Sequence, residues 1–180
     1  MRAVATRARI APGLVLHYER SMDAVVADAF ARIVRDELDE VIAGANAAPH
    51  PVARLAAVLD TLLDGSRSAV TMIWVQSWAL GTANPELAAR VRDEMDAWHA
   101  AIRELIVACG CPIDAPDAVT AQLIGMIDGL NAHALVRWGS VVQSRALMGR
   151  AVEGMLGLPS GALAPVSHGP HAHGSSHPPT

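Results

Sequence analysis

Tryptophan, methionine and a few polar side chains gather in the middle of the chain, where they could form a binding site for a small molecule. Indole rings and thioethers make an apolar wall, and convergent polar groups orient a ligand against such a wall. The faces of indole rings also attract cations. The sequence therefore predicts a ligand pocket lined by Met72, Trp74, Trp78, Met95, Trp98, His99, Met126, Asp128 and Asn131. The alternative is a tryptophan-rich core in which Asp128 and His133 are satisfied locally.

Catalytic or metal-binding chemistry has less support in these residues. Asp128 and His133 are five residues apart, which places them on poorly aligned faces of a helix. Cys109 and Cys111 lack the second pair of ligands that a zinc site needs, and the chain has no glycine-rich phosphate loop and no nucleophile elbow. We predict no enzyme, no catalytic residue, no resident metal and no cofactor. The histidines of segment 168–177 either bind divalent metal weakly or are incidental.

The elements that must position these residues are helices. Apolar residues recur at steps of three or four along nearly the whole chain, and no segment alternates as a strand does. Clusters of helix-breaking residues separate the helical segments, and Asn84 with Pro85 forms a helix start. We predict an all-α bundle of about seven helices, including segments that begin at Ser21, Pro51 and Pro85 and segments over about 67–80, 117–138 and 141–156.

Two of these segments have one clearly apolar face. In the segment after Pro85, four charged residues lie off the apolar face and are expected to point away from the core: Arg90, Asp93, Glu94 and Arg103. In the segment after Ser21 the apolar face is expected to hold Val26, Phe30, Ile33, Val34, Leu38 and Val41.

The last two helices carry small or apolar residues on more than one face. One face can pack inward while another meets a second copy of the chain, so a symmetric homodimer is the simplest solution. The candidate interface residues are Leu130, Ala134, Trp138, Leu147, Ala151 and Met155.

Charge is distributed unevenly along the chain. The formal net charge is −4, yet residues 1–20 carry four arginines against Glu19 alone. An anionic partner is therefore expected to meet the N-terminus. The most apolar stretch, residues 69–83, is shorter than a membrane span requires, and no signal peptide is apparent. We expect a cytoplasmic protein with no membrane partner.

The stretch "APGLVLHYERSMDAV" (11–25) has the pattern of a recognition helix followed by a new helix. In a helix-turn-helix unit the second helix enters the major groove of DNA with its N-terminal end. Here Ile10 would plug the turn, Ala11–Gly13 would begin the recognition helix, and Ser21 would cap the helix that follows.

This motif resembles that of the tetracycline-repressor (TetR) family. The preceding "VATRARIA" and the segments 82–106 and 118–139 also resemble the family, in the branch that includes the choline-responsive repressor of the betaine pathway. The resemblance covers about residues 3–158 and implies an all-α homodimeric repressor that binds operator DNA and senses a small-molecule effector. By position it implies DNA-binding roles for Arg7, Arg9, Ala11, Gly13, Leu14, Leu16, His17 and Tyr18.

The N-terminal region departs from the family pattern. Glu19 stands where the family has an aromatic ring, and Met22 stands where a lysine usually follows the capping serine. Ten residues precede Ala11, whereas two helices with their turns need about 25–30. We therefore expect a partial helix-turn-helix region over 1–22, a ligand-binding and dimerisation domain over 23–158, and a disordered tail over 159–180. A DNA-binding-deficient dimerising sensor is the alternative function.

Overall fold

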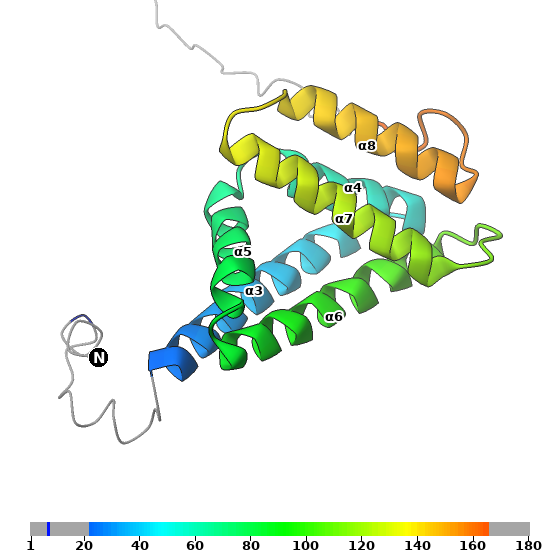
Figure 1. Cartoon of the computed structure of the whole chain (residues 1–180). Helices are drawn as coiled ribbons and strands as arrows, with labels where there is room; N and C mark the ends of the chain where they lie inside the picture. The colour runs from blue at the N-terminus through cyan, green and yellow to red at the C-terminus, as the bar shows by residue number, and fades with distance from the viewer. Residues whose placement is uncertain (1–6, 8–21, 166–180) are drawn as a thin grey trace, which may run out of the picture.

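The computed structural model describes Arg7 and residues 22–165 of the chain (Figure 1). Within this part every regular element is a helix, which confirms the all-α fold class predicted from the sequence. In chain order the six helices are α3 (Met22–Asn46), α4 (Pro51–Leu63), α5 (Ser68–Gly81), α6 (Pro85–Ala108), α7 (Pro116–Leu135) and α8 (Val141–Leu156).

The two longest helices, α3 and α6, lie side by side and form one wall of the bundle (Figure 1). Helix α5 packs on α3, α6 and α7, and α4 packs on α3, α6, α7 and α8. Helix α8 lies at the edge of the bundle and touches only α4 and α7 among the described helices. This arrangement leaves a large part of the α7–α8 surface uncovered.

Local sequence explains where several helices begin and end. Pro51, Pro85 and Pro116 occupy the first turns of α4, α6 and α7, where a missing N–H costs nothing. The predicted cap at Asn84 is confirmed, because its side chain accepts a 2.9 Å hydrogen bond from the backbone N–H of Leu87. Helix α8 ends at Gly157, whose φ of 65° is the left-handed conformation that glycine adopts most easily.

The packing of α3 against α6 differs from the expected faces at three positions. Glu94, expected to point outward, is only 5% exposed, because the buried stripe of α6 follows residues 87, 91, 94, 98, 102 and 105. Its Oε1 accepts a 2.9 Å hydrogen bond from Nη2 of Arg35 on α3, whereas its Oε2 is buried with no hydrogen-bond partner among the described residues. Val26 and Ile33, expected in the core, are 39% and 41% exposed.

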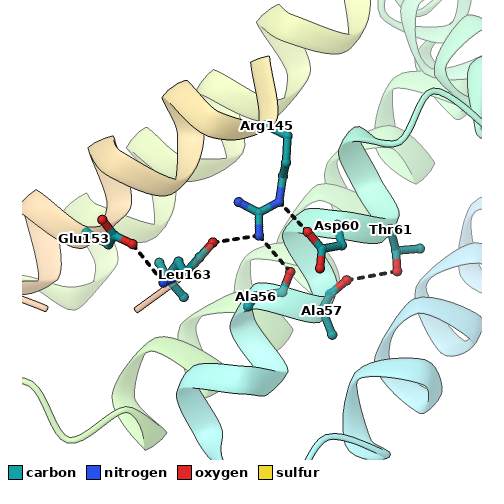
Figure 2. A network of polar contacts seen from close by, with 7 residues as sticks. All are labelled: Ala56, Ala57, Asp60, Thr61, Arg145, Glu153 and Leu163. Carbon is teal, nitrogen blue, oxygen red and sulfur yellow. Dashed lines mark hydrogen bonds and ion pairs between the residues drawn. The ribbon is translucent and has the colours of Figure 1, made fainter. Parts of the chain in front are cut away.

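The chain after α8 folds back onto the bundle through Leu163, which is fully buried (Figure 2). Arg145 donates from Nη2 to the carbonyl oxygens of Leu163 (2.9 Å) and Ala56 (3.4 Å), and from Nε to Oδ1 of Asp60 (2.6 Å). Glu153 Oε1 accepts a 2.8 Å hydrogen bond from the Leu163 N–H. We call these five residues the Arg145 clasp. It joins α4, α8 and the segment that follows α8.

The predicted start of the disordered tail, at Pro159, does not agree with the Arg145 clasp. The sequence predicts disorder from Pro159 onward, but the structure places Leu163 in the hydrophobic core. A single apolar residue in a proline- and glycine-rich segment is a weak signal, and it is reinforced here by polar contacts with Arg145 and Glu153. Residues 166–180, the rest of the expected tail, lie outside the described residues.

Candidate functional site

A cavity of about 310 Å³ lies among α3, α4, α5, α6 and α7. Its size falls at the lower end of the range typical of small-molecule sites. Most of its wall is apolar, and polar side chains enter it from several helices. The lining residues are Glu37, Leu62, Arg67, Thr71, Trp74, Val75, Trp78, Met95, Asp96, Trp98, His99, Ile102, Ala121, Ile124, Gly125, Ile127, Asp128 and Asn131.

Helix α5 contributes the aromatic side of the cavity. Its lining residues share one face of the helix, because they are spaced three, one and three positions apart: Thr71, Trp74, Val75 and Trp78. The Trp74 and Trp78 rings lie 6.0 Å apart, and Trp74 meets Phe30 of α3 edge-on at 5.1 Å. These ring contacts fix the orientation of Trp74, because edge-on pairs are favoured over face-to-face stacking.

A charged group joins α3 to the start of α5 at the cavity wall. Arg67 lies 3.7 Å from Glu37 Oε1 and 3.2 Å from Glu40 Oε1, and the Glu37 side chain is only 7% exposed. Burial raises the pKa of Glu37, while the charge of Arg67 and a hydrogen bond from Trp74 act in the opposite direction. Two charged residues that line the cavity, Glu37 and Arg67, therefore hold two helices together.

The opposite wall carries a carboxyl group of a different kind. Asp128 on α7 is largely buried, and this desolvation raises its pKa to about 6. Asn131 follows one turn later on the same helix and also lines the cavity. On α6, His99 Nε2 lies 3.3 Å from the carbonyl oxygen of Asp117, which connects the cavity wall to the first turn of α7.

Comparison with protein families identifies the domain that holds this cavity. Residues 51–157 match the family model described as "BetI-type transcriptional repressor, C-terminal". The chain belongs to the TetR family of transcriptional regulators. The match spans α4 to α8 and so includes most of the cavity wall. Searches of curated proteins and of solved structures return no match.

The cavity of this TetR-family regulator brings together seven of the nine residues predicted to line a pocket: Trp74, Trp78, Met95, Trp98, His99, Asp128 and Asn131. Met72 and Met126 do not line it. Met72 is 41% exposed on α5, and Met126 is partly buried against the hydrophobic core. Whether any of these residues contacts an effector stays a prediction.

Sequence reasoning missed three charged residues that line the cavity of the regulator: Glu37, Arg67 and Asp96. Glu37 and Arg67 belong to segments with several other charges, and Glu40, three residues after Glu37, is exposed. The available signal was the position of Glu37 beside Leu38 and Val41 on a helix with an apolar stripe. Arg67 has no comparable signal.

The candidate dimer residues of the regulator lie on α7, α8 and the turn between them. Trp138 is 68% and Leu147 is 55% exposed, and the neighbouring Val136 and Val142 are 75% and 77% exposed. Ala134 and Ala151 are also exposed. Leu130 and Met155 instead pack partly against the core. An interface role for these six residues stays a prediction.

The residues assigned to DNA by family resemblance cannot be compared with this geometry, with one exception. Arg7 is helical and exposed. The other seven, Arg9, Ala11, Gly13, Leu14, Leu16, His17 and Tyr18, lie outside the described residues.

Two further findings concern the part of the chain that the structure describes. Over Arg7 and residues 22–165, histidine, cysteine and acidic side chains nowhere form a group of three or more that could hold a metal ion. In the same residues, no helix has both the length and the apolar character that crossing a membrane requires.

Proposed function

We propose that this TetR-family regulator is a ligand-responsive repressor that leaves its operator when a small molecule fills the cavity. The observation that carries the proposal is the cavity of about 310 Å³ inside a BetI-type C-terminal domain. Its wall combines aromatic rings with a few polar groups, which is the composition of sites that bind small molecules. The matching family is one of BetI-type transcriptional repressors, which supports the repressor role.

Helix α3 offers a path from the cavity to the N-terminal motif. It begins at Met22, inside the stretch 11–25 that carries the motif, and it contributes Glu37 to the cavity wall. Ion pairs at 2.9 Å also connect α3 to α6, from Arg35 to Glu94 and from Asp28 to Arg90. A ligand that displaces Glu37 would bias the position of the helix next to the DNA-binding motif, as coupling between two sites requires.

The uncovered α7–α8 surface supports a homodimer. Val136, Trp138, Val141, Val142 and Leu147 are all exposed there, and contiguous apolar surface of this kind marks interaction sites. A two-fold axis through this surface would bury the same residues of both copies. The same symmetry would present one N-terminal motif from each copy to each half-site of an operator.

The test measures, by fluorescence anisotropy, how the whole chain binds labelled DNA from the region that flanks its own gene. The titration is done at low and at moderate salt. We expect saturable binding that weakens with salt and that competitor DNA of unrelated sequence does not abolish. Arg7→Ala should weaken binding and flatten its salt dependence, whereas Arg92→Ala, an exposed arginine on α6, should not. A folded dimer without specific DNA binding would refute the repressor function.

A second candidate, a DNA-binding-deficient dimerising sensor, is favoured by one observation. Glu19 stands in the motif where the family has an aromatic ring, and a carboxylate is costly to bury without a partner. This candidate predicts dimerisation without operator binding. Replacing Glu19 with phenylalanine would then restore DNA binding, which the repressor proposal does not require.

A further inference from the structure

The charged residues that line the cavity are mostly acidic. They are the guanidinium group of Arg67 and three carboxyl groups, those of Glu37, Asp96 and Asp128. Arg67 and Glu37 compensate each other, because Arg67 lies 3.7 Å from Glu37 Oε1 and the Glu37 side chain also accepts a hydrogen bond from Trp74. The two aspartates have no hydrogen-bond or ion-pair partner among the described residues. The wall therefore presents uncompensated negative charge to a ligand.

Of the two aspartates, Asp128 is better placed to bind a ligand. Its side chain is largely buried, which raises its pKa, but its carboxyl oxygens keep some accessible surface. Because Asp128 lines the cavity, a molecule inside the cavity can reach these oxygens. A desolvated carboxylate without a donor is costly, and a positively charged N–H group supplies both the hydrogen bond and the opposite charge. Asp96 is exposed, so water and salt screen its charge.

The rest of the wall suits the apolar part of a cationic molecule. Trp74 and Trp78 line the cavity from α5, with their rings 6.0 Å apart, and Trp98 lines it from α6. Indole rings bury large apolar areas, and their faces attract a nearby cation. Asn131, one turn after Asp128 on α7, adds an amide oxygen that can accept a hydrogen bond. An anion of the same shape would instead be repelled by the carboxyl groups.

We propose that the effector is a protonated amine with an apolar body, that its N–H group donates a hydrogen bond to the carboxylate of Asp128, and that the indole rings bind the apolar body. Asp128 is the specificity-determining residue. A quaternary ammonium ion has the same charge but no N–H to donate, so it binds more weakly than the protonated amine. Uncharged analogues lack both the charge and the charged donor. This inference rests on the proposed ligand response and defines the chemical class of the ligand.

Four naphthalene probes test the proposal by isothermal titration calorimetry of the whole chain at pH 7.5. The first is N,N-dimethyl-1-naphthylmethylamine, which is protonated at this pH and carries one N–H. The second is its N,N,N-trimethyl analogue, which keeps the charge and differs by one methyl group in place of that N–H. The third is 1-naphthylmethanol, which is uncharged, and the fourth is 1-naphthoate, which is an anion. Calorimetry is preferred because naphthalene and tryptophan both fluoresce.

A hydrogen bond to a charged group is worth about 10- to 150-fold in affinity. Because the Asp128 oxygens keep some accessible surface, we expect the low end, with the protonated amine about tenfold tighter than the quaternary ion and the alcohol. Asp128→Asn keeps the shape of the side chain and removes its charge, so it should abolish this preference while binding of the alcohol remains. The matched control is Asp93→Asn, which removes an exposed carboxyl group on α6 outside the cavity wall and should leave the preference unchanged.

Several results would overturn the proposal. One is a quaternary ion, alcohol or naphthoate that binds as tightly as the protonated amine. Others are an unchanged preference in Asp128→Asn, an equal loss of preference in Asp93→Asn, or no saturable binding of any probe. These measurements need no DNA. A protonated amine that binds as expected but never releases an operator would instead refute the proposed repressor response and leave the ligand class standing.

Discussion

Replacing Arg145 tests whether the Arg145 clasp stabilises the fold. Arg145→Met keeps most of the apolar stem and removes the guanidinium group. The wild-type side chain is 6% exposed and contacts Asp60, Ala56 and Leu163 at 2.6, 3.4 and 2.9 Å. The variant therefore removes the Arg145 donor from the Asp60 carboxylate, which keeps another interaction, and from the buried Leu163 carbonyl oxygen.

The size of the effect follows from the burial of each partner. Removing one member of a buried ion pair costs about 3–5 kcal/mol, because the other charge stays desolvated. The Asp60 side chain is 26% exposed, so water recovers part of this loss. The Ala56 carbonyl lies inside α4, where the helix itself supplies a donor. The guanidinium also has a buried Nη1 with no hydrogen-bond partner among the described residues, so its removal offsets part of the loss. We therefore expect a loss below this range, about 2 kcal/mol off the free energy of unfolding.

The measurement is urea unfolding followed by far-ultraviolet circular dichroism, at one fixed protein concentration because self-association would contribute. The matched control is Arg90→Met, which removes the same chemical group from a pair with Asp28 at 2.9 Å. Both side chains of that pair are about half exposed, at 50% and 51%, so less than about 1 kcal/mol should be lost. Equal losses in the two variants would refute the reasoning from burial.

Three further substitutions test other parts of the argument by the same unfolding assay. Burial holds the pKa of Asp128 at about 6 in the folded protein, above the value of about 3.9 for an exposed aspartate. The folded state therefore loses stability as pH rises from about 4 to about 6. Asp128→Asn should raise the free energy of unfolding by about 1–2 kcal/mol at pH 7.5 and by little at pH 4. A difference that stays constant between these pH values would contradict the raised pKa of Asp128. Leu163→Ala should cost about 2–4 kcal/mol, because the side chain is fully buried. The control is Leu147→Ala, since Leu147 is 55% exposed. An equal loss in both variants would show that the segment after α8 does not pack on the bundle. Asn84→Ala should cost about 1–2 kcal/mol through the lost cap of α6, and a neutral result would mean that the cap adds nothing.

Much of the fold follows from short-range signals that the sequence carries openly. A proline in the first turn and Asn84 as a cap locate two helix starts, since these residues act on the backbone within four positions. The cavity residue Trp98 was predictable in a similar way, because the periodic pattern of α6 indicates which face turns inward. The pattern of α7 gives no such indication for Asp128.

The rotation of helix α5 about its axis could not be predicted from its sequence pattern. Its apolar residues surround the helix axis, so the pattern does not determine which face meets the cavity. Met72 and Trp74 are two positions apart, about 200° around a helix, and the structure puts Trp74 at the cavity and Met72 in solvent. Tertiary contacts, such as the Trp74–Phe30 pair, decide the rotation.

Long-range polar pairs were not predictable either. The buried Glu94 is paired with Arg35, 59 residues earlier, and Leu163 accepts a hydrogen bond from an arginine 18 residues earlier. In both cases the local pattern indicates an exposed or disordered residue. The compensating partner becomes visible only after the helices are packed.

The separation of the cavity from α8 constrains how the regulator can work. Residues from α3 to α7 line the cavity, whereas α8 contributes none of the lining residues. Helix α8 is instead held to α4 by Arg145 and Asp60, two residues before the cavity-lining Leu62 of α4. A ligand in the cavity would touch α3, α4, α5, α6 and α7 directly and would reach α8 only through α4 and α7. Under the proposed function, the cavity would therefore act directly on α3, the helix next to the proposed DNA-binding motif, and only indirectly on α8.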